Sequence, residues 1–260
     1  MDHGLVKFEI VDSVAILTLS DPRTRNALSW EMADAMRAAL GKLGNARSLL
    51  ICADGKGFCS GGDLTMDGAG KSGFGEVLQR GLDEAVNPLM RELADLDVPV
   101  VTAVNGAAAG AGASLALSGD FVLVAEDGFF LFAFPKVGLA LDAGASWLLP
   151  RLTGLARATQ ALMLAERIHA KQAESWGMIY GVTRSDQLKD EAFALARRLA
   201  HGPTVAYAQI RKTLRQAVSL SYEEVLKLET AAQRACGDTH DCQNAIASFR
   251  AKKEPEFKGT

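Results

Sequence analysis

The stretch Val104-Asn-Gly-Ala-Ala-Ala-Gly-Ala-Gly-Ala-Ser-Leu-Ala-Leu117 constrains this chain most strongly, because eight consecutive residues from Gly106 are glycine or alanine. We expect a strand to end here in a turn of minimal side chains that leads directly into an apolar helix. The first N–H groups of a helix lack intrahelical acceptors and lie at the positive end of the helix dipole. The stretch therefore predicts either an oxyanion or phosphate site, or close packing of the helix on the strand.

Composition and charge exclude several classes of protein. Of the 260 residues, 48% are hydrophobic and 23% are charged, which suits a packed core. The net charge of −3 and the scattered basic residues predict no nucleic-acid partner. No apolar run approaches the roughly 20 residues that span a bilayer, and Met1-Asp-His-Gly4 lacks the apolar region of a signal peptide. We expect no membrane partner and a cytoplasmic location.

The four cysteines, at positions 52, 59, 236 and 242, show no paired metal-ligand spacing. Cys52 lies in an apolar run and is expected in the core. Cys242 lies near His240, but two such residues are a weak signal, so we expect no metal site and reduced thiols.

The first half of the chain alternates between strands and helices. Ser29 is a predicted N-cap for a helix over Trp30–Leu43, and a long helix is expected to cover Val77–Leu96 after a loop at Met66–Gly75. This alternation predicts right-handed βαβ units and an α/β fold with a largely parallel sheet. The expected strands are Val14–Leu19, Leu49–Ala53, Pro99–Val104, Phe121–Ala125 and Phe129–Phe132.

From about residue 143 the pattern predicts helices throughout. The last of these helices carries few apolar residues, among them Ile246 and Phe249, and we expect its apolar face to pack on another subunit. The expected helices are Leu155–Glu166, Ala170–Trp176, Gln187–Ala200, Val205–Val218, Tyr222–Cys236 and Asp241–Lys252.

Two Gly/Ala-rich turns, Phe58–Asp63 and Gly106–Gly112, follow successive predicted strands. In a parallel sheet both lie at the carboxyl ends of strands, where ligands bind. If their N–H groups converge, they form a two-donor oxyanion hole of the kind that stabilises an enolate, with Asp63 placed to tie the first loop down.

These residues resemble the crotonase (enoyl-CoA hydratase/isomerase) superfamily over nearly the whole chain. The resemblance rests on a combination of motifs. They are Pro22-Arg-Thr-Arg-Asn-Ala-Leu28, Gly57-Phe-Cys-Ser-Gly-Gly-Asp-Leu64, Pro99-Val-Val-Thr-Ala-Val-Asn-Gly106, Gly110-Ala-Gly112, Ala173-Glu-Ser-Trp-Gly-Met178 and Ala247-Ser-Phe-Arg-Ala-Lys252. Asn87–Leu93 and Ser146–Arg151 resemble the epoxyphenylacetyl-CoA isomerase branch.

The resemblance implies a crotonase (ClpP-like) fold of repeated ββα units. Residues 1–200 would form this core with the acyl-CoA site, and residues 201–260 a helical oligomerisation region of a homotrimer or dimer of trimers. The implied substrate is an acyl-CoA thioester, and no cofactor is implied beyond the coenzyme A that the substrate carries.

The resemblance also implies roles for individual residues. The backbone N–H groups of Ser60 and Ala111 would hold the thioester carbonyl. Arg23, Arg25 and Ala27 would lie by the CoA phosphates and adenine, although a solvated turn is the alternative for the arginines. Further substrate-binding positions are Gly61, Gly62, Asp63, Leu64, Gly110 and Phe134, with Phe249 and Lys252 reaching the CoA of a neighbouring subunit.

Hydratases of this superfamily use two glutamates, and this chain departs at both positions. The first is Ser114, and the second falls on Phe134 or Lys136. Adding water across a double bond normally requires one group to activate the water and one to protonate carbon. Neither group is where a hydratase would have it.

Asp142 is the remaining nearby acid, and its sequence neighbours are apolar. Such surroundings raise the pKa of a carboxyl by desolvation, which suits a general base. An N-cap for a helix that starts near Ala143 is the alternative. The dienoyl-CoA isomerase and epoxyphenylacetyl-CoA isomerase branches carry an aspartate in this turn, so the resemblance favours an isomerase with Asp142 as proton shuttle.

Three alternatives remain open. A hydratase could activate water with Asp142 alone. An aryl-CoA dehalogenase would use this aspartate as nucleophile, but it needs a histidine where this chain has Asn87-Pro88. A CoA-binding homologue without catalysis would not need an aspartate in an apolar turn. The acyl group is expected to be shaped by the Met66–Gly75 loop, the helix after it, and Phe132 and Phe134.

Overall fold

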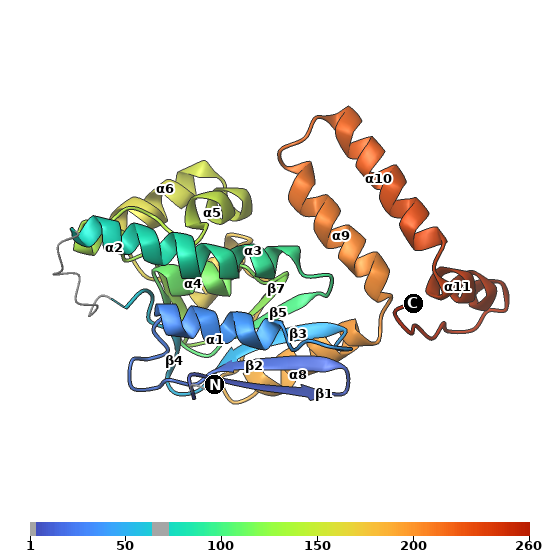
Figure 1. Ribbon diagram of the computed structural model, residues 1–260, viewed down its shortest axis with the longest axis horizontal. Coiled ribbons are helices and arrows are strands. Elements are labelled where there is room, and N and C mark those ends of the chain that lie inside the picture. Colours follow the sequence, from blue (N-terminus) through green and yellow to red (C-terminus); the bar gives the residue numbers. More distant parts are fainter. Residues whose placement is uncertain (1–3, 64–72) are drawn as a thin grey trace.

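The computed structural model describes residues 4–63 and 73–260, and two β-sheets form its centre (Figure 1). The larger sheet has the strand order β1-β2-β3-β5-β7-β10. Its strands from β2 to β10 are parallel, as the sequence predicts, and β1 is antiparallel to β2. Its strands are β1 (Val6–Val11), β2 (Val14–Leu19), β3 (Ser48–Ala53), β5 (Val100–Val104), β7 (Phe121–Ala125) and β10 (Gly181–Thr183).

The smaller sheet has the order β4-β6-β8-β9; β8 confirms the strand predicted at Phe129–Phe132, whereas β4 and β6 lie where the sequence predicted turns. The expectation of a loop at Gly57–Cys59 and a turn at Ala107–Ala109 is wrong, because these segments pair as parallel strands. Purely helical structure after residue 143 is also wrong, since β9 and β10 fall there. Strands of two or three residues are too short to show a period of two. The strands are β4 (Gly57–Cys59), β6 (Ala107–Ala109), β8 (Phe129–Leu131) and β9 (Ile168–His169).

The helices confirm those that the sequence predicts, with ends displaced by a few residues. The predicted long helix is present as three segments, because a π-helical turn, η1, separates α2 from α3. None of the described helices is long and apolar enough to cross a membrane. The helical segments are α1 (Trp30–Leu40), α2 (Phe74–Gly81), η1 (Leu82–Val86), α3 (Asn87–Asp95), α4 (Ala111–Ala116), the 3₁₀ turn η2 (Phe134–Val137), α5 (Ala145–Thr153), α6 (Leu155–Leu164), α7 (Ala170–Ser175), α8 (Leu188–Ala200), α9 (Thr204–Ala217), α10 (Tyr222–Gly237) and α11 (His240–Arg250).

Helices cover both faces of the larger sheet, and strand alternation decides which residue faces which layer. On β3, Leu49 and Ile51 belong to the main core with α1, α3 and α4. Leu50 and Cys52 point the other way and pack with the buried face of α8. The period of two along a strand produces this division. The placement of Cys52 in the core is confirmed.

The helices α9, α10 and α11 lie to one side of the two sheets (Figure 1). Arg211 on α9 is buried and anchors them: its Nε donates to Asp120 Oδ2 at 2.5 Å, and its guanidinium also donates to the carbonyls of Leu93 and Leu96. The chain turns from α8 to α9 directly after the predicted boundary between residues 200 and 201. The division of the chain into a core and an oligomerisation region stays a prediction.

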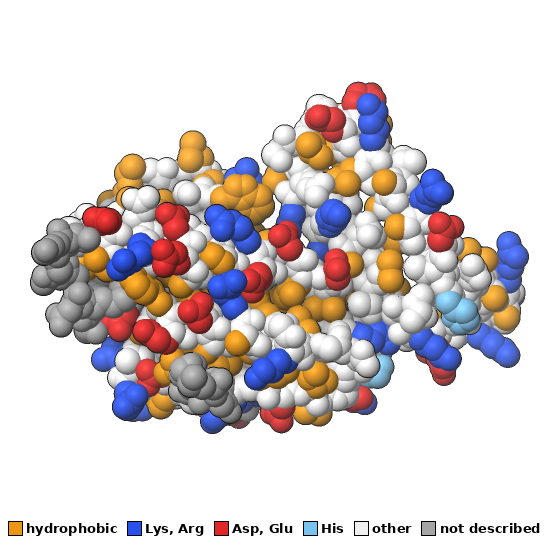
Figure 2. Space-filling view, in the orientation of Figure 1, with side chains coloured by type: hydrophobic (Ala, Val, Ile, Leu, Met, Phe, Trp, Pro, Cys, Tyr) orange, Lys and Arg blue, Asp and Glu red, His pale blue; other side chains and the backbone are white. Residues whose placement is uncertain are grey.

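Apolar side chains remain exposed on these three helices, and hydrophobic surface is visible there in Figure 2. Phe249 has 83% of its surface exposed and Ile246 has 48%, so neither has a burying partner within the described chain. The other exposed apolar residues of this region are Ile210, Leu214, Val218, Leu220, Tyr222 and Leu226.

Candidate active site

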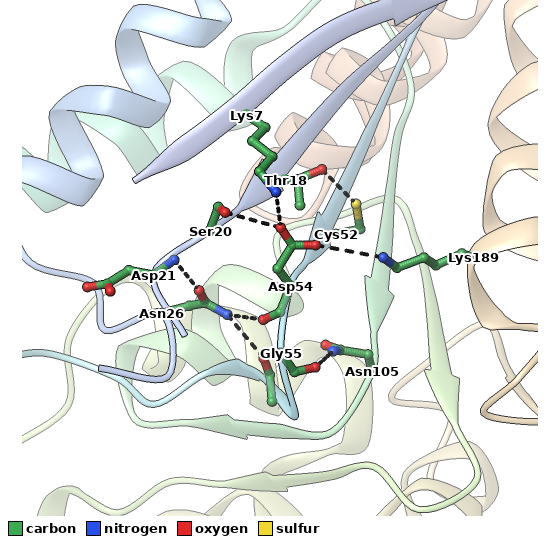
Figure 3. Close-up of polar contacts among 11 residues, drawn as sticks. Lys7, Thr18, Ser20, Asp21, Asn26, Cys52, Asp54, Gly55, Asn105 and Lys189 are labelled. Atoms are coloured by element: carbon green, nitrogen blue, oxygen red, sulfur yellow. Dashed lines mark hydrogen bonds and ion pairs between the residues drawn. The ribbon is translucent and has the colours of Figure 1, made fainter. Parts of the chain in front are cut away.

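Polar contacts hold the turns at the ends of β2, β3 and β5 together (Figure 3). Asn26 is fully buried, and its Oδ1 accepts from the Asp21 N–H at 2.8 Å. Its Nδ2 donates to the carbonyls of Asp54 and Gly57, at 2.9 and 3.2 Å. Asn105, after β5, donates from Nδ2 to the Gly55 carbonyl at 2.9 Å. The carboxyl ends of neighbouring strands therefore meet, as the sequence predicts for the two Gly/Ala-rich turns.

The turn Gly106–Gly112 both lets α4 pack closely on β4 and lines a cavity. A Cβ on Gly112 would lie 2.6 Å from Cys59 Sγ and 2.7 Å from the Cys59 carbonyl oxygen, so glycine lets α4 pack directly on β4. Gly110 caps α4 with φ 48° and ψ −127°, a conformation that glycine adopts readily and other residues rarely do. Close packing explains Gly112, whereas Gly110 and Ala111 line a cavity.

This cavity has a volume of about 410 Å³ and lies between the two turns, the α2–η1 segment, and the chain from η2 to α5. It brings together most of the predicted site residues: Ser60, Gly61, Gly62, Asp63, Gly110, Ala111, Phe134 and Asp142. The remaining lining residues are Leu28, Trp30, Gly75, Leu78, Gln79, Gly81, Leu82, Val86, Ala133, Val137, Leu139, Ala140 and Leu141.

Several predicted residues lie elsewhere. Leu64 and most of the expected Met66–Gly75 loop fall outside the described residues, although Phe74 and Gly75 are helical, which corrects the loop's end. Phe132 is fully buried in the core rather than on the cavity lining. Trp30 was not among the predicted site residues, because the residue after an N-cap carries no sign in the sequence of what its ring contacts.

Asp142 lies in the turn before α5 and does not cap this helix. The N-cap alternative is wrong, because α5 begins at Ala145, its cap is Gly144, and no side-chain cap bond forms. The Asp142 backbone carbonyl accepts instead from the Ala145 N–H at 3.0 Å and from Ser114 Oγ at 3.4 Å. Left-handed conformations at Ala143 and Gly144 separate Asp142 from the helix.

The Asp142 side chain is half-buried, and one oxygen of its carboxyl is fully buried. Its Oδ1 is one of four buried side-chain oxygens in the described chain that have no hydrogen-bond partner, and the other three do not line the cavity. Burial raises the pKa of Asp142 from 3.8 to about 6. A carboxyl with a pKa near neutrality can both take up and release a proton under ordinary conditions, as a general acid–base requires.

The two positions where hydratases of this superfamily carry glutamate supply no carboxylate here. Ser114 is fully buried, and its hydroxyl contacts the Asp142 backbone. Phe134 lines the cavity, whereas Lys136 is exposed outside it. Asp63, the second carboxylate on the described lining, takes part in an interaction of its own.

The two predicted oxyanion donors differ in the structure. Ala111 is the first residue of α4, a position whose N–H has no intrahelical acceptor. The Ser60 N–H donates to the Arg25 carbonyl at 3.0 Å, and Ser60 Oγ donates to the Thr24 carbonyl at 2.9 Å. The Ser60 amide is therefore already bonded, and it can serve a ligand only by sharing or exchanging that bond.

The residues predicted to contact CoA lie on the surface. The Arg23 side chain is 88% exposed and approaches Asp21 at 3.4 Å, and Arg25 is exposed with φ 58°. Ala27 is half-buried, Lys252 is exposed, and none of the predicted CoA contacts lines the cavity. Their roles stay predictions. Within residues 4–63 and 73–260, no three His, Cys, Asp or Glu side chains gather in a way that could hold a metal ion.

A family profile described as enoyl-CoA hydratase/isomerase matches residues 9–260. The chain belongs to the enoyl-CoA hydratase/isomerase family. It is 39% identical over 249 residues to the 1,2-epoxyphenylacetyl-CoA isomerase of Escherichia coli K12, covering 95% of each chain. It is 37% identical over 260 residues to a "probable enoyl-CoA hydratase" of Rhodobacter capsulatus, covering 100% of each.

The fold agrees with this membership. The crystal structure of an enoyl-CoA hydratase from Polaromonas sp. JS666 superposes with a TM-score of 0.92 at 32% identity, covering 97% of this chain and 99% of the other. The predicted crotonase fold is therefore confirmed. This protein is an enzyme of the enoyl-CoA hydratase/isomerase family, whose relatives include proteins named as isomerases and as hydratases.

Proposed function

We propose that this enzyme is an acyl-CoA isomerase that shifts a double bond or opens a ring through a thioester enolate. One observation carries the proposal: the cavity holds Asp142 with a buried, unpartnered carboxylate oxygen, while the positions of the two hydratase glutamates hold no carboxylate. A single carboxylate that moves a proton between two carbons needs no second acid–base group and consumes no water.

In the proposed reaction the Asp142 carboxylate removes a proton from a carbon of the acyl group. The electrons of the broken C–H bond enter the conjugated system, and negative charge develops on the thioester oxygen. The Ala111 N–H stabilises that charge, joined by the Ser60 N–H once its bond to Arg25 is shared or exchanged. Each such donor contributes about 3 kcal/mol in comparable sites. Protonated Asp142 then returns the proton to a different carbon, so the product has the composition of the substrate.

The rest of the substrate would extend out of the cavity. We propose that Arg23, Arg25 and Ala27 contact the CoA phosphates and adenine, and that Phe249 and Lys252 reach the CoA of a neighbouring subunit. The exposed apolar surface of α9–α11 supports an assembly through residues 201–260. Coenzyme A enters as part of the substrate, and the proposed chemistry needs no other cofactor. The name of the Escherichia coli relative favours an isomerase.

The hydratase alternative is favoured by the name of the Rhodobacter relative. In that reaction Asp142 would activate a water that adds to the β-carbon. The two reactions differ in the fate of solvent atoms, so we would run the wild-type enzyme in ¹⁸O-labelled water and in D₂O with 2-enoyl, 3-enoyl, dienoyl and epoxyphenylacetyl thioesters of CoA.

We expect rearranged products that carry deuterium at the exchanged carbon and no ¹⁸O. Mass spectrometry of the products distinguishes the outcomes. Labelled oxygen at the β-carbon, formed as fast as the best substrate is consumed, would establish a hydratase and contradict the isomerase proposal.

A further inference from the structure

One side of the cavity is an apolar wall built by the α2–η1 segment and the start of α1. Leu78, Leu82 and Val86 follow one another at intervals of four residues, and all three line the cavity. Trp30, the first residue of α1, lines it beside them. Figure 1 shows α1 running alongside α2 and α3. We call Trp30, Leu78, Leu82 and Val86 the acyl wall.

The π-helical turn that places part of this wall has a local cause. Pro88 has no N–H to donate to the carbonyl four residues earlier, and its ring would clash with that carbonyl in a regular helix. The chain widens instead, and the Asn87 N–H bonds to the Leu82 carbonyl five residues back. Such single π-helical turns are frequent at functional sites.

Trp30 is fitted to this helix at Gly81. A Cβ on Gly81 would lie 2.0 Å from Trp30 Nε1, 2.4 Å from Cε2 and 2.8 Å from Cζ2. No side chain larger than hydrogen fits there unless the indole moves. The Arg80 guanidinium lies over the same ring, with Cζ 5.6 Å from the centroid. Gly81 and Arg80 thus fix the position of an aromatic ring on the cavity lining.

We propose that Trp30, seated against Gly81, is the residue that limits the size of the acyl group. This inference rests on the proposed function, because it takes the cavity as the acyl site. The described lining on this side is apolar apart from Gln79, so the wall suits a hydrocarbon acyl group without charged substituents. Gly81 is a positioning residue: it acts by letting the indole lie close to the helix, which leaves the cavity open.

The test compares Gly81→Ala, Trp30→Leu and the double variant with the wild-type enzyme in its full oligomeric form. Isothermal titration calorimetry measures the association constants of butyryl-, hexanoyl-, octanoyl- and decanoyl-CoA. The readout is the ratio of the decanoyl-CoA constant to the butyryl-CoA constant. These thioesters are saturated, so the readout does not depend on the reaction catalysed. Gly237→Ala is the matched control, since Gly237 is exposed on α10 and a Cβ there meets nothing within 4 Å.

In Gly81→Ala the new methyl and the displaced indole both add volume at the wall. We expect the decanoyl-to-butyryl ratio to fall by about 10-fold, the low end of what one methylene changes in an apolar pocket. Trp30→Leu should raise the ratio by a similar factor. The double variant should resemble Trp30→Leu, because without the indole the methyl has nothing to displace, and such non-additivity is the mark of contacting residues. Gly237→Ala should leave the ratio unchanged.

The inference is overturned if Gly81→Ala and Trp30→Leu both bind with the wild-type ratio, or if their effects simply add in the double variant. Thermal melting checks that each variant folds, and a Gly81→Ala that does not fold leaves Trp30→Leu to decide. Failure of the isomerase proposal is separable, because the solvent-label experiment decides it and a hydratase would bind the same saturated thioesters. A wild type that binds none of the four thioesters would instead show that the cavity is not an acyl-CoA site. If the variants bind the thioesters with the wild-type ratio of association constants, only the proposed role of Trp30 is rejected.

Discussion

Replacing Asp142 with asparagine is expected to stabilise the folded protein while removing its activity. The Asp142 side chain is half-buried on a largely apolar lining and one of its oxygens is fully buried without a partner, and this burial raises the pKa of Asp142 from 3.8 to about 6. Ionising the Asp142 carboxyl therefore costs more free energy in the folded protein than in the unfolded chain. Asparagine has nearly the same shape and no charge, so the variant avoids the cost of desolvating a carboxylate.

The size and pH dependence of this gain follow from the pKa shift. Below about pH 4 the carboxyl is protonated in both states, and Asp142 costs nothing relative to an uncharged group. Between about pH 4 and 6 the unfolded chain loses the proton while the folded protein keeps it, so the free energy of unfolding falls by about 1.4 kcal/mol per pH unit. Above the folded pKa the cost is constant at about 3 kcal/mol, which is the upper limit of the gain in Asp142→Asn, because the amide oxygen inherits the unpartnered site.

Thermal melting from about pH 4 to pH 8 measures this gain. The melting temperature of Asp142→Asn should exceed that of the wild type by several degrees at about pH 8, since about 1 kcal/mol corresponds to roughly 2–4 °C in a protein of this size. The difference should vanish at about pH 4. Asp97→Asn makes the same chemical change at an exposed carboxylate and serves as the control.

The Asp142→Asn variant should be more stable than the wild type but much less active. Asp142→Asn should lose at least about 10²-fold in kcat, the low end for general acid–base catalysis, with substrate binding retained. The wild-type kcat/KM should rise with pH through an apparent pKa of about 6, because the base must be ionised. The reasoning fails if the variant keeps wild-type turnover, or if its stability gain is the same at both ends of the pH range.

Two further predictions concern the oxyanion donor and the assembly. Ala111→Pro removes one N–H at a helix start that tolerates proline, so turnover should fall about 10²–10³-fold with little change in melting temperature; full turnover in the folded variant would disprove the role of Ala111. Light scattering should give the mass of a trimer or hexamer, because Ile246 and Phe249 on α11 are exposed in the single chain. A monomeric mass at micromolar concentration would contradict this.

Most of the long elements follow, in order and type, from local patterns along the chain. Short, nearly continuous runs of β-branched and aliphatic residues predicted β2, β3, β5 and β7, as is typical of parallel strands buried on both faces. The N-cap at Ser29 predicted the start of α1, and its hydroxyl does accept from the Met32 N–H at 3.2 Å. The edge strand β1 and the short strands β4, β6, β9 and β10 were missed. The short strands exist because they pair with distant segments, and local propensity does not create them.

The sequence also identified most of the candidate site, since the two Gly/Ala-rich motifs that resemble the family, Gly57–Leu64 and Gly110–Gly112, contribute residues to the cavity lining. It could not decide between a base and a helix cap for Asp142, because both need the same residue in the same turn. The structure decides against the cap, since left-handed conformations at Ala143 and Gly144 start α5 three residues later. Similarly, the bond from the Ser60 amide to Arg25 joins two loops 35 positions apart and has no local signal.

Which side chains share the cavity depends on the three-dimensional fold. Trp30 and Gly81 lie on different helices, and neither carries a sign in the sequence that an indole rests against a glycine backbone. The sequence predicted one long helix through Pro88, and only the structure showed the π-helical turn before it and its effect on the wall. Helices and strands can be predicted from local patterns because their formation depends on neighbours along the chain. The desolvation of Asp142 and the shape of the acyl wall depend on neighbours in space.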